Sequence, residues 1–370
     1  MSMGKWQEYK LGEVAEVKGG KRLPKGEMLV SYETQHPYIR VTDMTQKWIH
    51  KKGLLFVTEQ VQKSICRYTV NSGNVILSIV GSIGLVSRIG DDIDRANLTE
   101  NCVKIIPNKN VLDDDYLYYY LISSNGQYEI NKRNVGAVQP KLPIYNINDI
   151  VISLPSLNEQ KKIAIILSSL DDKVDLLRRE NATLEAMAET LFRQWFVVEA
   201  KEEWNEGNLG DLIEVKYGKD HKKLMDGNIP VFGSGGVMRY ADTALYSKES
   251  VLIPRKGSLN NVMYINEPFW TVDTMFYTEM RRPNVAKYVY HLVKELDLAN
   301  MNVGSAVPSM TTEVLNNIPI DIPPQTVFDK FEDAVSPAYS KIQANNKQIQ
   351  TLIQTRDGLL PRLMSNEIKI

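Results

Sequence analysis

Residues 6–21 read WQEYKLGEVAEVKGGK, and residues 204–219 read WNEGNLGDLIEVKYGK. Nine of the sixteen positions are identical, at a constant offset of 198 residues. Solenoid repeats have periods of about 20–50 residues, so this spacing excludes a solenoid. The chain has 370 residues, which is long enough for two or three domains of about 100–200 residues each. We therefore predict a duplicated domain.

Four further pairs of stretches extend the duplication. They are 75–82 with 251–258, 115–123 with 286–294, 134–142 with 302–310, and 149–155 with 317–323. The first and last pairs are short apolar runs typical of buried strands, and the second has the spacing of a short amphipathic helix. The offset falls to 168 along the chain. This decrease predicts shorter loops in the second copy, because loops absorb changes in length more readily than strands and helices do.

Each copy is followed by a long stretch with the periodicity of a coiled coil. Apolar residues alternate at spacings of four and three over residues 163–195, and a matching series covers 331–363. A helix of about 40 residues is about 60 Å long, so two such helices most simply pack on each other. Asn181 and Asn345 are polar members of the two series and are expected to fix register and orientation.

Three residues predict irregularities in the second helix. Pro337 is expected to start or kink it, and Gly358 and Pro361 are expected to distort its last turns.

The predicted order is domain, helix, domain, helix. The expected bounds are 1–153 for the first domain, 154–200 for the central helix, 201–322 for the second domain and 323–370 for the C-terminal helix. The patterns together predict an α/β (α+β) fold with two domains joined by two long antiparallel coiled-coil helices. Such a pairing relates the domains by a pseudo-twofold axis, which matches duplex DNA with two half-sites.

Composition excludes several classes of protein. Hydrophobic content is 43% and charged content is 24%, which is ordinary for a globular chain. The net charge of −1 argues against a generic polycationic nucleic-acid binder, although not against local basic loops. No stretch has the length of apolar residues that a membrane span needs. Cys66 and Cys102 do not form a disulfide framework, and the four histidines have no zinc-ligand spacing. We expect a cytoplasmic protein with no metal site.

Common catalytic motifs are missing. The Gly-Lys pairs at 20–21 and 218–219 lack the spacing and the hydroxyl residue of a phosphate-binding loop. The stretch VFGSGG (231–236) is similar to the glycine-rich turn of S-adenosylmethionine-dependent methyltransferases. The Asp/Asn-Pro-Pro-aromatic motif of the enzymes that act on DNA amines is absent, because the one Pro-Pro pair stands in the sequence IPPQ (322–325). We favour a plain turn or a DNA-facing loop there, and we expect no catalytic residue.

Three stretches carry a family resemblance: GAVQPKLPIYNINDIVISLPSLNEQKKIAIIL (136–167), TLFRQWF (190–196) and RDGLLPRLMSNEI (356–368). With them, residues 5–368 resemble the specificity subunit of type I restriction-modification enzymes. The family pattern is a Gly-x-x-Gln-Pro loop, a strand, a Pro, a Glu-Gln pair and a long helix. The matching residues here are Gly136, Gln139, Pro140, Pro155, Glu159 and Gln160. The second copy departs from the pattern at Val307, which precedes Pro308, and at Thr326-Val327.

The resemblance implies a non-catalytic, sequence-specific DNA-binding subunit. Each domain reads one half of a bipartite double-stranded DNA target, and the helices serve as a spacer ruler and as a docking surface for two methyltransferase subunits. Those subunits bring S-adenosylmethionine, and motor-nuclease subunits bring ATP and Mg²⁺, so no cofactor is expected in this chain. Two alternatives are a solitary DNA-binding regulator or scaffold and a stand-alone DNA methyltransferase. The missing motifs disfavour the second.

Loops that differ between the copies, while anchored at matching positions, are expected to read different half-sites. Arg can bind guanine, Asp can accept from cytosine, and Asn or Gln can bind adenine, while glycine turns let the backbone approach phosphate. An Arg40–Asp43 pair and a plain turn at 81–84 are the alternatives. The candidates in the first domain are Arg40, Thr42, Asp43, Gly81, Ser82, Lys132, Arg133, Asn134, Gln139 and Lys141.

In the second domain, Arg255 and Lys256 stand where the first copy has the apolar pair 79–80, so this loop has gained charge. That difference suggests a direct DNA contact, and the alternative is pairing with Glu249 or Glu267. The candidates here are Ser234, Arg255, Lys256, Ser258, Asn260, Asn302, Ser305 and Ser309.

Apolar side chains gather at the end of each long helix. We expect part of this surface to dock the partner subunits, and the alternative is that these residues close the helix seam internally. The candidates are Phe192, Trp195, Phe196, Leu359, Leu360 and Leu363.

Overall fold

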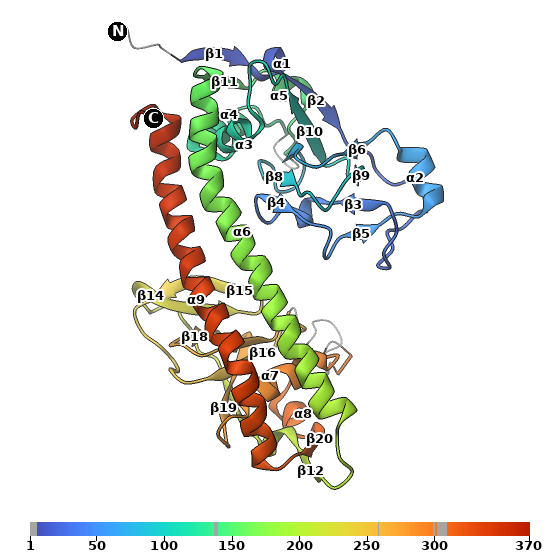
Figure 1. Ribbon diagram of the computed structural model, residues 1–370, viewed down its shortest axis with the longest axis vertical. Helices are drawn as coiled ribbons and strands as arrows, with labels where there is room; N and C mark the ends of the chain where they lie inside the picture. Colours follow the sequence, from blue (N-terminus) through green and yellow to red (C-terminus); the bar gives the residue numbers. More distant parts are fainter. Residues whose placement is uncertain (1–5, 137–139, 258, 299, 302–308) are drawn as a thin grey trace. The chain divides into compact units, whose positions relative to one another are not determined.

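The computed structural model describes residues 6–136, 140–257, 259–298, 300–301 and 309–370. Its contacts divide the chain into two units, Met1–Arg179 with Asn345–Ile370 (unit 1), and Glu180–Ala344 (unit 2). Each unit holds one copy of the duplicated domain and part of each long helix (Figure 1). We call the copy from β1 to β11 domain 1 and the copy from β12 to β20 domain 2.

Domain 1 combines short strands with short helices. Its main sheet has the strand order β2-β10-β7-β8-β4, a second sheet has the order β5-β3-β9-β6, and β1 pairs with β11. The strands are β1 (Gln7–Lys10), β2 (Ala15–Gly19), β3 (Pro37–Ile39), β4 (Trp48–Ile49), β5 (Leu55–Phe56), β6 (Thr69–Val70), β7 (Val75–Ser78), β8 (Val86–Ile89), β9 (Ala96–Leu98), β10 (Cys102–Pro107) and β11 (Val151–Leu154). The helices are α1 (Leu11–Val14), η1 (Val41–Asp43), α2 (Glu59–Ile65), α3 (Asp114–Ile122), α4 (Ser124–Lys132) and α5 (Ile144–Asn148).

Domain 2 repeats this plan. Its main sheet has the order β13-β19-β16-β17, a second sheet has the order β15-β14-β18, and β12 pairs with β20. The strands are β12 (Asn205–Asn208), β13 (Ile213–Tyr217), β14 (Asp226–Gly233), β15 (Gly236–Ala241), β16 (Ser250–Pro254), β17 (Met263–Ile265), β18 (Trp270–Thr271), β19 (Met275–Met280) and β20 (Pro319–Ile322). The helices are η3 (Leu209–Asp211), α7 (Ala286–Glu295) and α8 (Thr312–Asn316). The predicted mixed α/β duplication is confirmed.

One set of backbone hydrogen bonds recurs in both domains around a turn that we call the central turn, residues 98–102 in domain 1 and 271–275 in domain 2. In domain 1 the pairs are Lys21 N to Leu98 O (2.8 Å), Thr99 N to Ile39 O (3.1 Å), Ile79 N to Asn101 O (2.8 Å) and Gly20 N to Cys102 O (3.0 Å). In domain 2 they are Lys219 N to Thr271 O (2.8 Å), Val272 N to Phe232 O (3.0 Å), Arg255 N to Thr274 O (2.8 Å) and Gly218 N to Met275 O (3.1 Å). These bonds equate Ile39 with Phe232 and Ile79 with Arg255.

The equated residues also locate the length difference between the copies. The offset is 193 between Ile39 and Phe232 and 176 between Ile79 and Arg255, so the largest shortening falls between these two anchors. In domain 1 that segment forms β4, β5, α2 and β6. The prediction that loops carry most of the difference is therefore only partly correct, because short strands and a helix change as well.

The Gly-Lys pair that closes the repeated stretch is explained by a close backbone approach. A Cβ added to Gly20 would lie 2.0 Å from the carbonyl oxygen of Thr99, and a Cβ added to Gly218 would lie 2.0 Å from that of Val272. Both carbonyls belong to the central turn, so only glycine lets the chain reach it. Both copies keep glycine at this position because each makes the same close contact with its own central turn.

We predict that Gly218→Ala destabilises domain 2 by about 1–3 kcal/mol or more, because backbone must move to admit the methyl group. Gly235→Ala is the matched control, since an added Cβ there meets nothing within 4 Å, and it should change stability by less than about 0.5 kcal/mol. Urea unfolding of the full chain, followed by circular dichroism, measures both. Equal midpoints for Gly218→Ala and the unchanged chain would refute the close approach.

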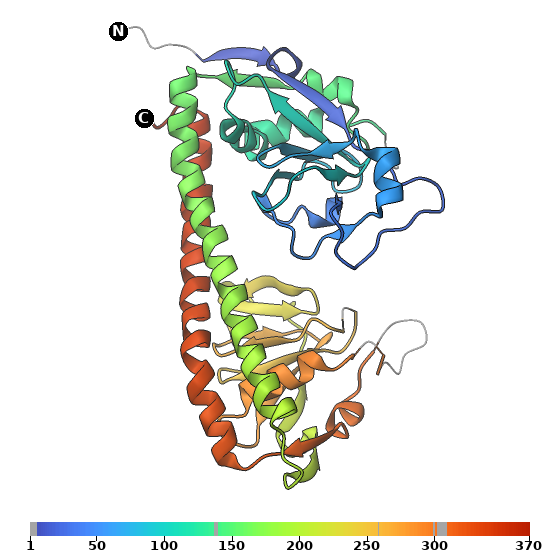
Figure 2. The same cartoon turned by 45° about the vertical axis from the view of Figure 1, so that its right-hand side comes forward.

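The two long helices are α6 (Leu157–Arg193), which continues as a π-helical turn, η2 (Gln194–Val198), and α9 (Gln325–Met364). In unit 1, residues 163–167 of α6 share a core with residues 360–364 of α9, and Val174 and Leu177 pack against Ile349. In unit 2, residues 188–192 of α6 share a core with residues 328–335 of α9. Early α6 thus meets late α9 in unit 1, and late α6 meets early α9 in unit 2, which is the order of an antiparallel pair (Figure 2). The predicted seam is confirmed within each unit.

Two details of the second helix differ from expectation. The helix begins at Gln325, so the prediction that Pro337 starts it is wrong, and it continues past Gly358 and Pro361 to Met364. Phe331 and Val335 precede the proline and are buried in the core of unit 2. Their packing against the core keeps the chain helical across Pro337, although proline lacks the N–H donor of a regular helical hydrogen bond.

Arg356 interrupts the apolar pattern of the seam because it is one half of an ion pair. Its Nη1 lies 2.7 Å from Oδ1 of Asp171 on α6, and the Asp171 side chain is only 4% exposed. Tyr119 of α3 donates its hydroxyl to the same carboxylate at 2.7 Å. The residue of α9 that corresponds to Asp171, at the offset of 168 residues, is Tyr339. Its hydroxyl lies 2.8 Å from Nε2 of His291 on α7. Each domain is therefore joined to its helices by its own buried polar contact.

Burial lowers the pKa of His291 from 6.5 to about 4. Below pH 6.5 the unfolded histidine gains a proton that the folded one does not, so domain 2 should lose stability as the pH falls from 6.5 to 4. The loss should be about 1.4 kcal/mol for each pH unit. Above pH 6.5 this group should have no effect.

Hydrogen exchange of α7 peptides in the full chain at pH 7 and pH 5 tests this, after correction for intrinsic exchange rates. His291→Leu is the control, because the corresponding residue of α3 is Leu121. The variant should be less stable at pH 7, since Tyr339 loses its partner, but its stability should change less between the two pH values. An equal pH response in the two chains would contradict the assignment.

Among the described residues, no helix combines the length and the apolar character that crossing a membrane requires.

Candidate nucleic-acid interface

The structure brings two predicted loops of domain 2 together with Ser309, the described end of the third. Met310 N donates to Arg255 O at 2.9 Å, and Lys256 forms an isolated β-bridge with Ser309. Asn261 Nδ2 donates to Ser234 O at 2.8 Å. The hairpin turn at 233–236, the loop after β16 and residues 309–310 therefore meet at one edge of the domain. Lys256 and Asn260 are exposed there.

Domain 1 builds the corresponding edge with the same bonds. Leu142 N donates to Ile79 O at 3.0 Å, and Val80 forms a β-bridge with Lys141. Lys141 also exchanges two backbone hydrogen bonds of 2.8 Å with Val135. The turn that carries the candidates Gly81 and Ser82 is exposed, and Gly81 has a φ of +77°. Glycine adopts this conformation without strain, so the turn presents bare backbone beside Lys141.

Arg40 and Asp43 pair with each other. The Asp43 carboxylate accepts from Arg40 N at 2.8 Å, Nε at 3.1 Å and Nη2 at 2.7 Å. These bonds join Arg40, which precedes η1, to Asp43 at its end, and the Asp43 side chain is only 9% exposed. Thr42 lies between them and is exposed. The structure therefore has the arrangement that the alternative interpretation described, and Thr42 is the member of this group that is open to a ligand.

The basic candidates after α4 differ in availability. Arg133 pairs with Glu129 at 2.5 Å and donates to the carbonyl of Asp149 at 2.6 Å, so its guanidinium links parts of domain 1. Lys132 is exposed, with its ammonium 5.9 Å from the ring centre of Tyr128. Lys132 thus remains open to phosphate. Asn134 is half-buried beside them, and its Nδ2 donates to Asn131 at 3.4 Å.

Four candidates lie outside the described residues, and nothing is concluded about them. They are Gln139, Ser258, Asn302 and Ser305.

The stretch 231–236 forms the turn of a β-hairpin. Gly233 pairs with Gly236, and β14 leads directly into β15. A glycine-rich phosphate or cofactor turn needs a helix N-terminus under the ligand, and here a strand follows. A hollow of about 700 Å³ adjoins the hairpin and is lined in part by His221, Ser234 and Asp273. The predicted preference for a loop over a cofactor site fits this geometry.

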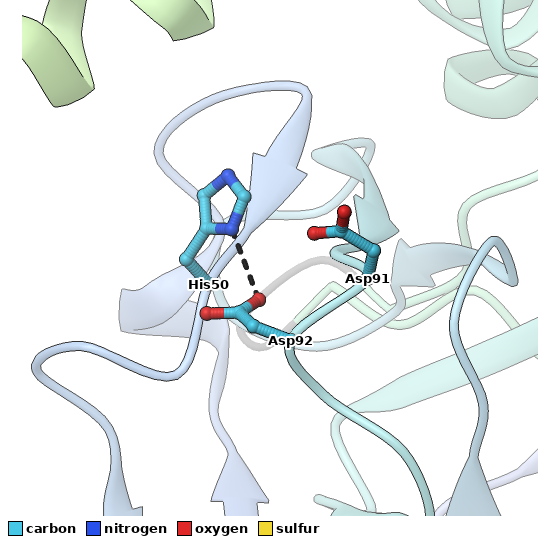
Figure 3. Close-up of side chains that lie close together, drawn as sticks. All are labelled: His50, Asp91 and Asp92. Carbon is cyan, nitrogen blue, oxygen red and sulfur yellow. Dashed lines mark hydrogen bonds and ion pairs between the residues drawn. The ribbon is translucent and has the colours of Figure 1, made fainter.

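A histidine and two aspartates form the candidate metal group of the described chain. His50, Asp91 and Asp92 have ligand-type atoms within 4.8 Å of one another (Figure 3). His50 Nδ1 lies 3.0 Å from Asp92 Oδ1, and Nε2 lies 3.0 Å from Oδ1 of Asp175 on α6. Both ring nitrogens thus have carboxylate partners, and the contacts fit a link between domain 1 and α6. The expectation of no metal in this chain stays a prediction.

The apolar docking candidates are largely engaged in the cores. Phe192 is buried and stacks on His291, and Phe196 packs on Tyr288. Trp195 and Phe196 are half-buried against the core of unit 2. Leu359, Leu360 and Leu363 pack in the core of unit 1, where Leu359 is half-buried and the other two are buried. Their role in docking partner subunits stays a prediction. The half-buried members, Trp195, Phe196 and Leu359, keep some surface that a partner could contact.

Sequence reasoning missed a row of exposed apolar residues on α6. Ile165 is 67% exposed and Leu176 is 50% exposed in unit 1, and Met187 is 58% exposed in unit 2. Steps of eleven residues correspond to three helical turns, so these side chains share one face of α6. The spacing of eleven residues is present in the sequence, where the four-and-three pattern of the seam is the stronger signal.

Comparison with known proteins identifies the family. The model of the type I restriction modification DNA specificity domain matches residues 3–186 and 201–354. The chain is 25% identical to the type I restriction enzyme MjaIX specificity subunit of Methanocaldococcus jannaschii, over 99% of this chain and 94% of that protein. It is 24% identical to the HindI specificity subunit of Haemophilus influenzae, over 53% of this chain and 41% of that protein.

The fold is that of a solved relative as well. The crystal structure of the type I restriction-modification S subunit from M. genitalium has a TM-score of 0.60 at 18% identity, covering 98% of this chain and 97% of that one. Because the family model covers most of the sequence in two matches, the chain belongs to the family of type I restriction-modification DNA specificity subunits. Members of this class recognise DNA sequence, and catalysis resides in their partner subunits. The predicted family, the DNA-recognition function and the non-catalytic role are confirmed.

Proposed function

We propose that this chain directs a type I restriction-modification complex to a bipartite double-stranded DNA target, with domain 1 reading one half and domain 2 the other. One observation carries the proposal. Both domains anchor their variable loops to the same hydrogen bonds of the central turn, while the loops themselves differ in charge and sequence. A frame that the two domains share, and that presents different side chains at equivalent positions, suits the reading of two different half-sites.

The exposed members of these loops are the proposed DNA contacts. In domain 1 the residues that contact DNA are Thr42, Ser82, Lys132 and Lys141. In domain 2 they include Lys256. Lysines bind phosphate as point charges and fix the position of the protein on the duplex. The remaining loop residues supply contacts to base edges or let the backbone approach closely. With a net charge of −1, the chain relies on local basic groups and on its partners for affinity.

The partners follow from the same proposal. Two methyltransferase subunits dock on the helices and bring S-adenosylmethionine, and motor-nuclease subunits bring ATP and Mg²⁺. The helices set the spacing between the half-sites, with bounds of 154–200 and 323–370, and the complex acts in the cytoplasm. The exposed apolar row on α6 supports docking there, because such residues favour burial in a protein interface.

Co-expression with the methyltransferase subunit of its host, followed by mapping of N6-methyladenine on plasmid DNA, tests the proposal. We expect a motif of two specific parts separated by a gap of fixed length. Omission of this chain should abolish that pattern, because the methyltransferase then has no sequence guide. A continuous motif, or the same motif without this chain, would refute the division of reading between two domains.

A double variant with serine in place of both Ile165 and Leu176 should bind the methyltransferase subunit at least tenfold more weakly. The two substitutions remove apolar surface that the interface would otherwise bury. Both residues are exposed in the chain alone, so its folding should be little affected. The exposed Lys173 of the same helix provides a control as Lys173→Ser. Gel filtration and titration calorimetry measure assembly. Unchanged affinity in the double variant would exclude this face of α6.

A further inference from the structure

Domain 2 differs from domain 1 at two equivalent positions that touch each other. The repeated stretch equates Tyr217 with Gly19, and the central-turn hydrogen bonds equate Arg255 with Ile79. The Arg255 guanidinium lies over the Tyr217 ring, 5.2 Å from its centre. Domain 1 has neither the ring nor the charge. Because the two differing residues contact each other, we treat Tyr217 and Arg255 as one functional pair that is specific to domain 2.

The contact is held firmly on the arginine side. Arg255 N donates to the carbonyl of Thr274 at 2.8 Å, and its own carbonyl accepts from Met310 N at 2.9 Å. The side chain adds a hydrogen bond from Nη1 to the carbonyl of Asp273 at 3.1 Å. The backbone is thus fixed on both sides, and the guanidinium is fixed by one carbonyl and one aromatic face.

The tyrosine side is equally well supported. Tyr217 ends β13, where its backbone pairs with Phe276 of β19. The two rings meet edge to face, with centres 5.1 Å apart. Tyr217 is nevertheless 52% exposed. An exposed tyrosine that is held by one ring and covered by a guanidinium is a platform for that guanidinium.

The chemistry of the arginine decides what it can bind. A guanidinium has five N–H donors in one plane, and within the described part of the chain Arg255 uses its side chain for the single hydrogen bond to Asp273. Two parallel donors match the O6 and N7 acceptors of guanine in the major groove. A guanidinium that is already oriented loses less freedom on binding than a mobile one does.

We propose that Arg255 reads a guanine in the half-site of domain 2 and that Tyr217 is the residue that positions it. This inference rests on the proposed function. Domain 1, with Gly19 and Ile79, reads its half-site without such a contact. Phosphate binding by Arg255 is the competing interpretation, and it predicts a different response to base changes.

The test uses the complex with the methyltransferase subunit and a DNA library randomised over the target. Arg255→Ala should reduce discrimination at one guanine position of one half-site by about tenfold or more. Tyr217→Ala should reduce it at the same position by about two- to fivefold. Tyr217→Phe keeps the ring and should restore it. Tyr217→Ala should add little in the Arg255→Ala background, because the platform then supports nothing.

Tyr240→Ala is the matched control, because Tyr240 is another exposed tyrosine of domain 2, and it should leave that guanine position unchanged. A uniform loss of binding to all sequences, with a weaker salt dependence, would show a phosphate contact and overturn the proposal. Additive effects of the two substitutions would remove the positioning role of Tyr217. The other half-site serves as an internal standard, because it should still be recognised in every variant. If the unsubstituted complex shows no two-part motif, the proposed function itself fails.

Discussion

The structure depends on the approach of two glycines to the carbonyl oxygens of the central turns. Gly20 and Gly218 come so close that a single added carbon would lie 2.0 Å from a backbone oxygen. This approach lets four backbone hydrogen bonds form around each turn, and those bonds tie the strand ends of the domain to one another. Backbone bonds do not depend on side-chain identity. The segments that leave the anchors are therefore free to change while their starting points stay in place.

Within each domain, the backbone frame around the central turn is therefore separate from the side chains proposed to contact DNA. Ile79 and Arg255 occupy the same place and make the same backbone bond, yet one is apolar and the other is charged. Both side chains are only half-buried, so a substitution at this position costs less stability than one in the fully buried core. A protein that recognises two different half-sites needs this freedom, because phosphate contacts set position while base contacts set sequence.

Much of the frame could be predicted from the sequence, because duplication supplies an internal comparison. The period of four and three located both long helices, and the shared motifs located the strands β7, β11, β16 and β20 and the short helices α3 and α7. Side-chain pairing was beyond such reasoning. The Arg40–Asp43 pair could be suspected only as an alternative, and the links of Arg133 to Glu129 and Asp149 join groups whose proximity no pattern reveals. Tyr217 was visible as the one change from GGK to YGK, but its meaning depends on the position of Arg255 above it.

The contacts between each domain and its helices have diverged further than the frame. Asp171 and Tyr339 are equivalent positions of the two long helices, yet the first is a carboxylate bound by Arg356 and Tyr119, and the second is a phenol bound by His291. A buried polar group without its partner is strongly destabilising. Each domain is thus matched to its own helix surfaces, although the two domains share their backbone plan. Duplication supplied two equal frames, and these buried pairs now make each frame specific for its place in the chain.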